Sequence, residues 1–397
     1  MPGAALAEVP TGAAPLSRVP ARAPGRAAPE GVASGRAAVL DNLRRIARAE
    51  LAPIAGRVDH EGFYPEAARR ALGEAGAFSL HLRAPSPLGW PDLPAAIEAM
   101  AAISSQCMSS GFCAWCQNAS GWYLENTANA GLRERLQPGI ATAALLGGTG
   151  LSNPVKALAG LEALKLKGRR VAGGWRVSGT LPWVSNLGEG HWFGTIFRDA
   201  EEAGHRVMAM VRCGAPGVEI RQSIRFIALE GTGTYSILFR DAFIPNDDLL
   251  ADPLGDMARR IKPGFVLLQA GMGLGVIEAC QASMRRDNVH YARINSHLPL
   301  QADALEDQLG ALRERVLGLA GAPLEPGPGY LRRVLETRVA CSELTLAASQ
   351  AAMMHAGARG YLEGSVVSRL QREAWFVAII TPSIRHLRHE LAALAAN

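Results

Sequence analysis

The chain has 397 residues, enough for two or three packed units with a large buried core. Hydrophobic residues make up 48% and charged residues 19%, and a net charge of +5 is too dilute to indicate nucleic-acid binding. No stretch of about 18 uninterrupted apolar residues occurs, which argues against a transmembrane helix. Six cysteines in a chain of this length do not form a disulfide framework. These features predict a soluble, cytoplasmic protein without a nucleic-acid or membrane partner.

The first 38 residues differ in composition from the rest of the chain. They are mostly Ala, Pro and Gly, with scattered Arg and almost no periodic apolar pattern. Such a segment buries too little apolar surface to offset the entropy lost on ordering. It also lacks the continuous apolar core of a signal peptide. We therefore expect a flexible tail over residues 1–38.

The remaining chain changes its apolar pattern twice. From residue 39 to 139, apolar residues recur at three- and four-residue spacing, beginning with Leu40 and Leu43, which predicts amphipathic helices. Between residues 140 and 255, short apolar runs alternate with Gly, Asn and Pro, which predicts strands and a hairpin near Gly173. The helical period returns over 256–397. This order predicts an α+β, mostly α fold with an N-terminal helical domain, a central β-barrel and a C-terminal four-helix bundle.

Five short sequence strings occur within this predicted order of helices and strands. They are Trp175-Arg-Val-Ser-Gly, Pro182-Trp-Val-Ser-Asn, Phe239-Arg-Asp-Ala-Phe-Ile-Pro, Gly357-Ala-Arg-Gly-Tyr and Leu370-Gln-Arg-Glu-Ala. Together they resemble the acyl-CoA dehydrogenase family over about residues 39–397. The resemblance implies the three-part fold described above, a flavin cofactor and an oxidoreductase activity.

The resemblance implies that Trp183 packs against the flavin isoalloxazine and that the Ser185 hydroxyl hydrogen-bonds the ring near N5. A hydroxyl at that point stabilises the reduced ring and tunes its electronics. Outside the family context, the same two residues would be a barrel tryptophan and a turn serine. FAD is the expected cofactor, and FMN is the alternative.

A second flavin element is only partly kept. The family's Thr-Glu-Pro-x-x-Gly-Ser-Asp corresponds to Leu146-Gly-Gly-Thr-Gly-Leu-Ser-Asn, so that Leu146 falls on the motif's Thr and Ser152 on its Ser. Backbone donors do not depend on the side chain and survive such replacements. We expect Leu146 and Ser152 to contact the cofactor. The alternative is that residues 147–150 form a flexible connection.

The contacts that the family makes between subunits are also incomplete. The family's Arg-x-x-Phe-Gly, whose Arg reaches the cofactor pyrophosphate, corresponds to Asn295-Ser-His-Leu-Pro. Losing this ligand should weaken the hold on the diphosphate by roughly 2 kcal/mol. Gly357, Ala358 and Gly360 match the family's glycine-rich element, which implies a contact with the flavin of a neighbouring subunit. A homodimer or homotetramer is therefore expected.

The family's catalytic carboxylate is missing from its usual place. The corresponding residue is Thr381, whose hydroxyl has no useful basicity near neutral pH. The family's other position for this Glu, early in the first helix after the β-region, is also without an acid, since none occurs between Asp256 and Glu278. His386 lies just beyond Thr381 and is the candidate for proton transfer. The alternative is a basic C-terminal helix that faces solvent or a neighbouring subunit.

These departures predict an atypical dehydrogenase or a flavin monooxygenase that acts on a small molecule or an acyl thioester. A flavin reductase or an electron-transfer flavoprotein would then be its redox partner. Two alternatives are an ordinary acyl-CoA dehydrogenase with a relocated base and a non-catalytic flavin-binding scaffold. Cys113-Ala-Trp-Cys116 has no second pair of metal ligands at suitable spacing, so we interpret it as core packing and expect no metal site.

Overall fold

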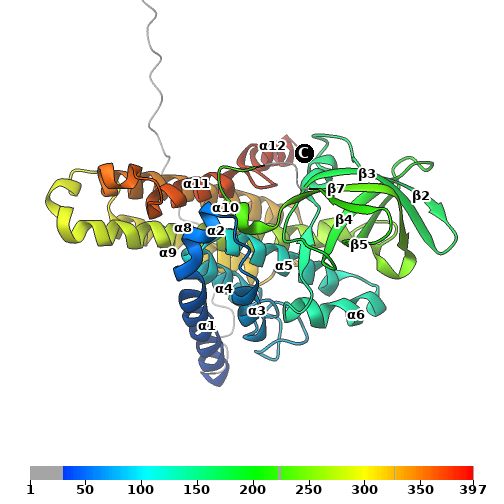
Figure 1. Cartoon of the computed structure of the whole chain (residues 1–397), viewed down its shortest axis with the longest axis horizontal. Helices are drawn as coiled ribbons and strands as arrows, with labels where there is room; N and C mark the ends of the chain where they lie inside the picture. The colour runs from blue at the N-terminus through cyan, green and yellow to red at the C-terminus, as the bar shows by residue number, and fades with distance from the viewer. Residues whose placement is uncertain (1–29, 222–224, 326, 397) are drawn as a thin grey trace, which may run out of the picture.

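A computed structural model of the chain describes residues 30–221, 225–325 and 327–396. An eight-stranded sheet lies at one end of the molecule, and long helices extend from it to the other end (Figure 1). The predicted order of helices, a β-rich middle and helices again is confirmed.

The N-terminal part is helical. Helix α1 begins at Glu30, inside the segment predicted to be a tail, while residues 1–29 lie outside the described residues. Asp92 caps α4 by accepting a hydrogen bond from the backbone N–H of Ala95 at 2.7 Å. Helix α5 follows after a single residue and is buried along its whole length. The helices of this part are α1 (Glu30–Leu51), α2 (Ala55–His60), α3 (Glu66–Glu74), α4 (Leu93–Gln106), α5 (Met108–Asn126) and α6 (Ala130–Ala141).

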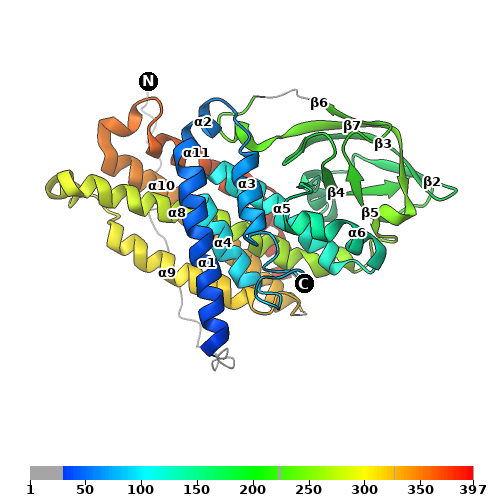
Figure 2. The ribbon, with the colours of Figure 1, turned by 60° about the horizontal axis from the view of Figure 1, so that its bottom comes forward.

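The middle part forms one sheet in the strand order β6-β7-β3-β2-β4-β5-β8, with β1 added in parallel to β4. Strands β6 and β8 end this order, so the expected barrel is a curved open sheet in the described residues (Figure 2). The predicted hairpin near Gly173 joins β2 to β3. The elements are β1 (Gly147–Thr149), α7 (Ser152–Leu158), β2 (Lys167–Val171), β3 (Gly174–Val184), β4 (Trp192–Asp199), β5 (Arg206–Arg212), β6 (Val218–Arg221), β7 (Tyr235–Pro245) and β8 (Leu249–Ala251).

The C-terminal part is a bundle around α8. The last part of the predicted helical region is divided into two helices, because α11 ends at Ile379 and Pro382 lies in the connection before α12. The helices are α8 (Met257–Asn295), α9 (Ala302–Ala320), α10 (Pro328–Ala356), α11 (Val366–Ile379) and α12 (Ile384–Ala396). Helix α8 is long and apolar enough to cross a membrane, but 78% of its most apolar window is buried inside the protein, as expected of a core helix.

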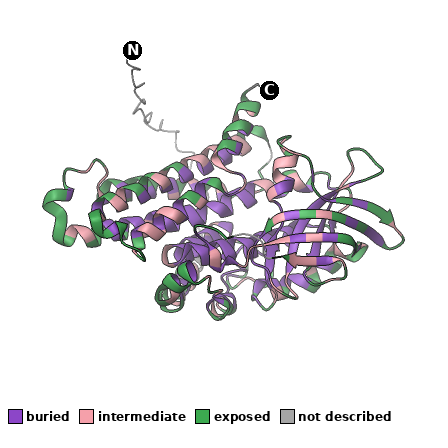
Figure 3. Ribbon diagram, turned by 45° about the horizontal axis from the view of Figure 1, so that its top comes forward, coloured by how far each residue is buried: buried purple, intermediate pink, exposed green. Residues whose placement is uncertain are grey.

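Two hydrophobic cores hold these parts together. One core joins the N-terminal helices to the C-terminal bundle, and the other lies within the sheet (Figure 3). Helix α8 packs so closely against α4 that a Cβ at Gly271 or Gly275 would overlap the α4 backbone. On the opposite side of α8, a Cβ at Gly273 would overlap Cys341 of α10. The two helical parts therefore form one packed body rather than two separate units.

Candidate active site

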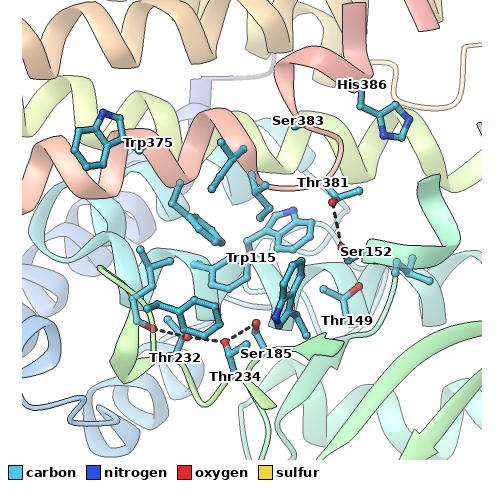
Figure 4. A pocket seen from close by; sticks show the side chains of 18 of the residues that line it. Trp115, Thr149, Ser152, Ser185, Thr232, Thr234, Trp375, Thr381, Ser383 and His386 are labelled. Atoms are coloured by element: carbon cyan, nitrogen blue, oxygen red, sulfur yellow. Dashed lines mark hydrogen bonds between the residues drawn. The ribbon is translucent and has the colours of Figure 1, made fainter. Parts of the chain in front are cut away.

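A cavity of about 820 Å³ lies where the sheet meets α5, α7, α8, α11 and α12 (Figure 4). Its lining is mostly apolar and rich in aromatic rings from several elements. Phe112 of α5 stacks edge-on against Phe376 of α11, with ring centroids 4.7 Å apart. Trp115 of α5 packs in the same way against Phe265 of α8 at 5.0 Å. This aromatic wall suits a flat organic ligand.

The sheet side of the cavity carries the two residues predicted to hold a flavin. Trp183, near the end of β3, leaves 46% of its surface exposed although it is large and apolar. Ser185 follows it and is buried; its hydroxyl accepts a hydrogen bond of 2.7 Å from Thr234. Because Thr234 supplies that proton, the Ser185 proton is left to donate into the cavity. An exposed aromatic face beside a free hydroxyl donor fits a planar ring with an acceptor at its edge.

Strand β1 forms the adjoining part of the cavity wall, and here the residue that lines the cavity is not the predicted one. Leu146 is buried in the helical core and does not line the cavity, whereas Thr149 at the end of β1 does. Thr149 bridges to Ser185 and shares a hydrogen bond of 2.8 Å with the Tyr123 hydroxyl. The stretch 147–149 is a buried strand and not a flexible connection.

The glycines of this stretch explain why the family's larger residues are absent. A Cβ at Gly148 would lie 2.5 Å from the carbonyl oxygen of Ser185, closer than a real Cβ contact allows. Glycine therefore permits β1 to lie against the residues after β3. In the sequence, Thr149 could have been identified as a cavity residue because it is the one hydroxyl residue of the Gly147–Thr149 strand and stands at its end.

The predicted residues Ser152 and Thr381 meet at the helical side of the cavity. Their hydroxyl oxygens are 3.2 Å apart, although 229 positions separate them in the chain. The Thr381 carbonyl accepts a hydrogen bond of 2.9 Å from Gln269 of α8, and Gln269 accepts one from the buried Arg338 of α10 at 3.1 Å. The connection between α11 and α12 is thus fixed to the core of the bundle.

His386 of α12 also lines the cavity, and it is part of a charged chain. Its Nε2 lies 2.8 Å from a carboxylate oxygen of Glu390, whose other oxygen pairs with Lys262. Burial would raise the pKa of Glu390, but the His386 hydrogen bond and Lys262 outweigh it and lower that pKa below its ordinary value. Glu390 is therefore ionised and holds the proton of His386 on Nε2, so that Nδ1 is left as the second ring nitrogen.

Other predicted residues lie elsewhere. Gly357, Ala358 and Gly360 belong to a short 3₁₀ helix after α10 and do not line the cavity. Asn295 is buried, and its side-chain amide donates to the His355 carbonyl at 3.1 Å, so it serves the local structure. Within the described ranges, no group of three His, Cys, Asp or Glu side chains could hold a metal ion.

Behind the cavity, Asn186 ties the residues after β3 to the N-terminal helices. It has a positive φ of 65°, and its side-chain oxygen accepts hydrogen bonds from Arg69 at 2.7 Å and from Tyr64 at 3.0 Å. Its amide donates to the Gly147 carbonyl at 2.7 Å and to Gln117 at 3.2 Å. These four contacts fix the backbone directly beside Ser185.

Comparisons with known proteins show which family the chain is similar to. Residues 35–144 match the family model "Acyl-CoA dehydrogenase, N-terminal domain". The short-chain specific acyl-CoA dehydrogenase of Homo sapiens is 24% identical over 352 residues, which cover 85% of this chain and 84% of that protein.

Solved structures show the same fold over almost the whole chain. Butyryl-CoA dehydrogenase from Megasphaera elsdenii superposes with a TM-score of 0.80 at 15% identity, covering 91% of this chain and 98% of that one. Dibenzothiophene monooxygenase from Paenibacillus sp. A11-2 gives 0.75 at 16% identity, covering 89% and 96%. The chain thus carries a region that matches the acyl-CoA dehydrogenase N-terminal domain, and its overall fold is that of the acyl-CoA dehydrogenase superfamily.

Proposed function

We propose that this enzyme does not use a carboxylate base in the manner of an acyl-CoA dehydrogenase, and that it acts as a flavin monooxygenase or an atypical dehydrogenase. One observation carries the proposal: among the described residues that line the cavity, Glu162 is the only carboxylate. By the resemblance, the position of the family's base corresponds to Thr381, whose hydroxyl lies 3.2 Å from that of Ser152.

Glu162 is poorly suited to replace the missing base. Burial would raise its pKa, but a hydrogen bond of 2.8 Å from Asn153 and the nearby Lys156 outweigh this effect and lower the pKa below its ordinary value. A carboxylate with a lowered pKa is a weaker proton acceptor near neutral pH. The cavity therefore lacks the group that removes an α-proton in ordinary acyl-CoA dehydrogenation.

The residues present fit a flavin on the sheet side. Trp183 would cover one face of the ring, Ser185 would donate to its edge, and Thr149 and Ser152 would line the same side. FAD is the favoured cofactor and FMN the alternative; when bound, it supplies hydride acceptance or oxygen chemistry. The protein's part is to orient the ring, exclude water and handle protons.

The proton handling falls to His386. It is nearly fully buried, it lines the cavity, and Glu390 and Lys262 fix its orientation from behind. Its Nδ1 is buried and has no hydrogen-bond partner within the described residues, so proton exchange with a substrate hydroxyl or amine would require the ring to turn toward the cavity.

The cavity lining indicates a substrate with an apolar portion. Leu161, Ile227 and Ile379 line the cavity and are exposed, with 42%, 71% and 66% of their surfaces accessible. Exposed apolar side chains around an apolar cavity mark a ligand site or an interface. We propose a small apolar or aromatic molecule, free or carried as a thioester, as the substrate.

The proposal includes the wider setting of the enzyme. Reduced flavin would come from a flavin reductase in the monooxygenase case, and electrons would leave to an electron-transfer flavoprotein in the dehydrogenase case. A cytoplasmic homodimer or homotetramer is proposed, in which Gly357, Ala358 and Gly360 reach the flavin of a neighbouring subunit. They do not line this chain's own cavity, which is compatible with that role.

The first test is flavin binding, measured by the change in flavin fluorescence on titration. Trp183→Ala should raise the flavin dissociation constant about tenfold, because aromatic packing contributes about 1–1.5 kcal/mol. Trp375→Ala is the matched control, since Trp375 lines the cavity from α11 and is exposed to a similar extent, 45%. Equal losses in both variants, or a wild-type protein that binds neither FAD nor FMN, would contradict the proposal.

The second test separates the two reactions. The flavin-loaded enzyme is mixed anaerobically with butyryl-CoA and longer acyl-CoAs, and the loss of flavin absorbance is followed. In a parallel experiment, chemically reduced flavin and oxygen are supplied, and oxygen uptake is measured. We expect no rapid bleaching by acyl-CoAs. Because free reduced flavin itself consumes oxygen, only a rate of oxygen uptake that differs from that of an enzyme-free control supports a monooxygenase, and rapid bleaching identifies an ordinary dehydrogenase with a relocated base.

A further inference from the structure

A buried guanidinium lies directly behind the sheet side of the cavity. Arg69 of α3 is only 4% exposed, and its Nη1 donates a hydrogen bond of 2.7 Å to the side-chain oxygen of Asn186, the residue after Ser185. The backbone N–H of Asn186 donates at 2.9 Å to the carbonyl of Thr232, which lines the cavity (Figure 4). A single layer of residues therefore separates the Arg69 charge from the proposed flavin site.

Within the described residues, the contacts of Arg69 are neutral, and no carboxylate pairs with it. Its guanidinium donates to the Tyr64 hydroxyl and stacks on the Tyr64 ring, with the guanidinium carbon 3.9 Å from the ring centre. Burial raises the pKa of Tyr64, so this hydroxyl stays neutral. The other terminal nitrogen of Arg69, Nη2, is buried without a hydrogen-bond partner. Glu66, which lies one turn earlier, pairs with the exposed Arg70 instead.

The titratable groups around Arg69 do not cancel its charge. His191 lies 3.3 Å from the Asn186 carbonyl, and burial lowers the pKa of its ring, so the ring is neutral near pH 7. Burial raises the pKa of the Cys113 thiol to about 11, and the Arg69 charge opposes that rise. The Cys113 thiol in turn donates to the Thr232 carbonyl at 3.6 Å, so the charge acts on groups at the cavity wall. In buried surroundings, such a charge acts on another charge more strongly than it would in water.

We propose that Arg69 raises the reduction potential of the bound flavin through its charge. This inference rests on the proposed flavin site and adds a residue that tunes it. The oxidised isoalloxazine is neutral, and its reduction by two electrons with the uptake of one proton leaves an anion. A fixed cation behind Ser185 stabilises that anion and has no such effect on the neutral ring. Because Arg69 acts across Asn186 and does not line the cavity, it is a positioning residue and not a catalytic one.

The experiment measures the reduction potential of the flavin in the FAD-loaded protein, against a reference dye under anaerobic conditions. Arg69→Gln removes the charge and keeps an amide donor for Asn186, whereas Arg69→Met removes both. Each variant should lower the ratio of the affinities for reduced and oxidised flavin at least tenfold, which is a fall of about 30 mV for a two-electron couple. Arg69→Lys keeps the charge and should stay within about threefold of wild type.

Two controls separate the charge from the local structure. Arg70→Gln removes a cation from the same helix, but Arg70 is exposed and pairs with Glu66, so the potential should not change. Tyr64→Phe removes the hydroxyl that donates to Asn186 at 3.0 Å and keeps the Arg69 charge, so the affinity ratio should change less than about threefold. Equal shifts in Tyr64→Phe and Arg69→Gln would show that packing sets the potential, and would overturn the proposal.

Two other results would also overturn it: an unchanged potential in both neutral variants, or a fall in Arg69→Lys as large as that in Arg69→Gln. If neither neutral variant folds, the wild type decides. At pH 6, where free reduced flavin is largely neutral, the bound reduced flavin should have the absorbance spectrum of the anion, and the spectrum of the neutral form would refute the proposal. A protein that binds neither FAD nor FMN would contradict the proposed flavin site instead, so the two failures are distinguishable.

Discussion

Replacing Asn186 tests whether its four side-chain hydrogen bonds hold the backbone beside Ser185 in place. Asn186→Gly keeps the positive φ of 65° without strain and removes all four side-chain hydrogen bonds. A buried hydrogen bond contributes about 1 kcal/mol net, and one to a charged group such as Arg69 contributes more. The expected loss of unfolding free energy is therefore about 4 kcal/mol.

Asn186→Ala distinguishes the contribution of the backbone conformation from that of the side-chain hydrogen bonds. It removes the same hydrogen bonds but places a Cβ in the left-handed region, which costs about 1 kcal/mol more. Equilibrium urea unfolding, followed by tryptophan fluorescence, measures both variants against wild type. If the glycine variant loses less than about 1 kcal/mol, the four hydrogen bonds contribute little and the reasoning is refuted.

Two further predictions concern carboxylates near α11. Thr381→Glu should allow butyryl-CoA to reduce the flavin slowly under anaerobic conditions, which wild type does not allow. The reason is that a general base typically increases the rate of proton removal by about 10²–10⁴-fold. Fast reduction in wild type would show that another group is the base. Burial raises the pKa of Glu373 to about 7, so folding takes up a proton there, and this group's contribution to stability falls as the pH rises from about 4.5 to 7. The free energy of unfolding, measured in urea at pH 5 and at pH 8, should therefore fall more in wild type than in Glu373→Gln, by up to about 3 kcal/mol. If the difference between the two proteins is the same at both pH values, the pKa of Glu373 is not raised.

The order of helices and strands and the position of Trp183 and Ser185 could be predicted because each depends on neighbours in the sequence. Apolar periodicity reports which face of a helix is buried, and Pro182-Trp-Val-Ser-Asn is one continuous string at the end of a strand. Thr381 was predicted from the resemblance, as the residue nearest to the position of the family's catalytic Glu. Its contact with Ser152 shows that both strings belong to one cavity.

The parts that sequence reasoning missed depend on distant neighbours or on small shifts in register. Leu146 was predicted by a match without gaps, whereas the short strand β1 places Thr149 at the cavity. Arg69 meets Asn186 across 117 positions, and Lys262 meets Glu390 across 128, and no local pattern indicates either pair. The division of the last helical segment was signalled by Pro382, which the periodicity alone conceals.

The glycines of α8 have a mechanical consequence. Because Gly271 and Gly275 bring α8 against the α4 backbone, and Gly273 does the same toward α10, these helices cannot slide past one another without steric overlap. The backbone of α8 behind Phe265, its one residue in the cavity lining, is thus held in place, and a change of cavity shape that admits a bulky ligand would have to come from other parts of the lining. One such part is the segment around Ile227, which Arg372 joins to α11 through a 2.9 Å hydrogen bond to the Ile227 carbonyl.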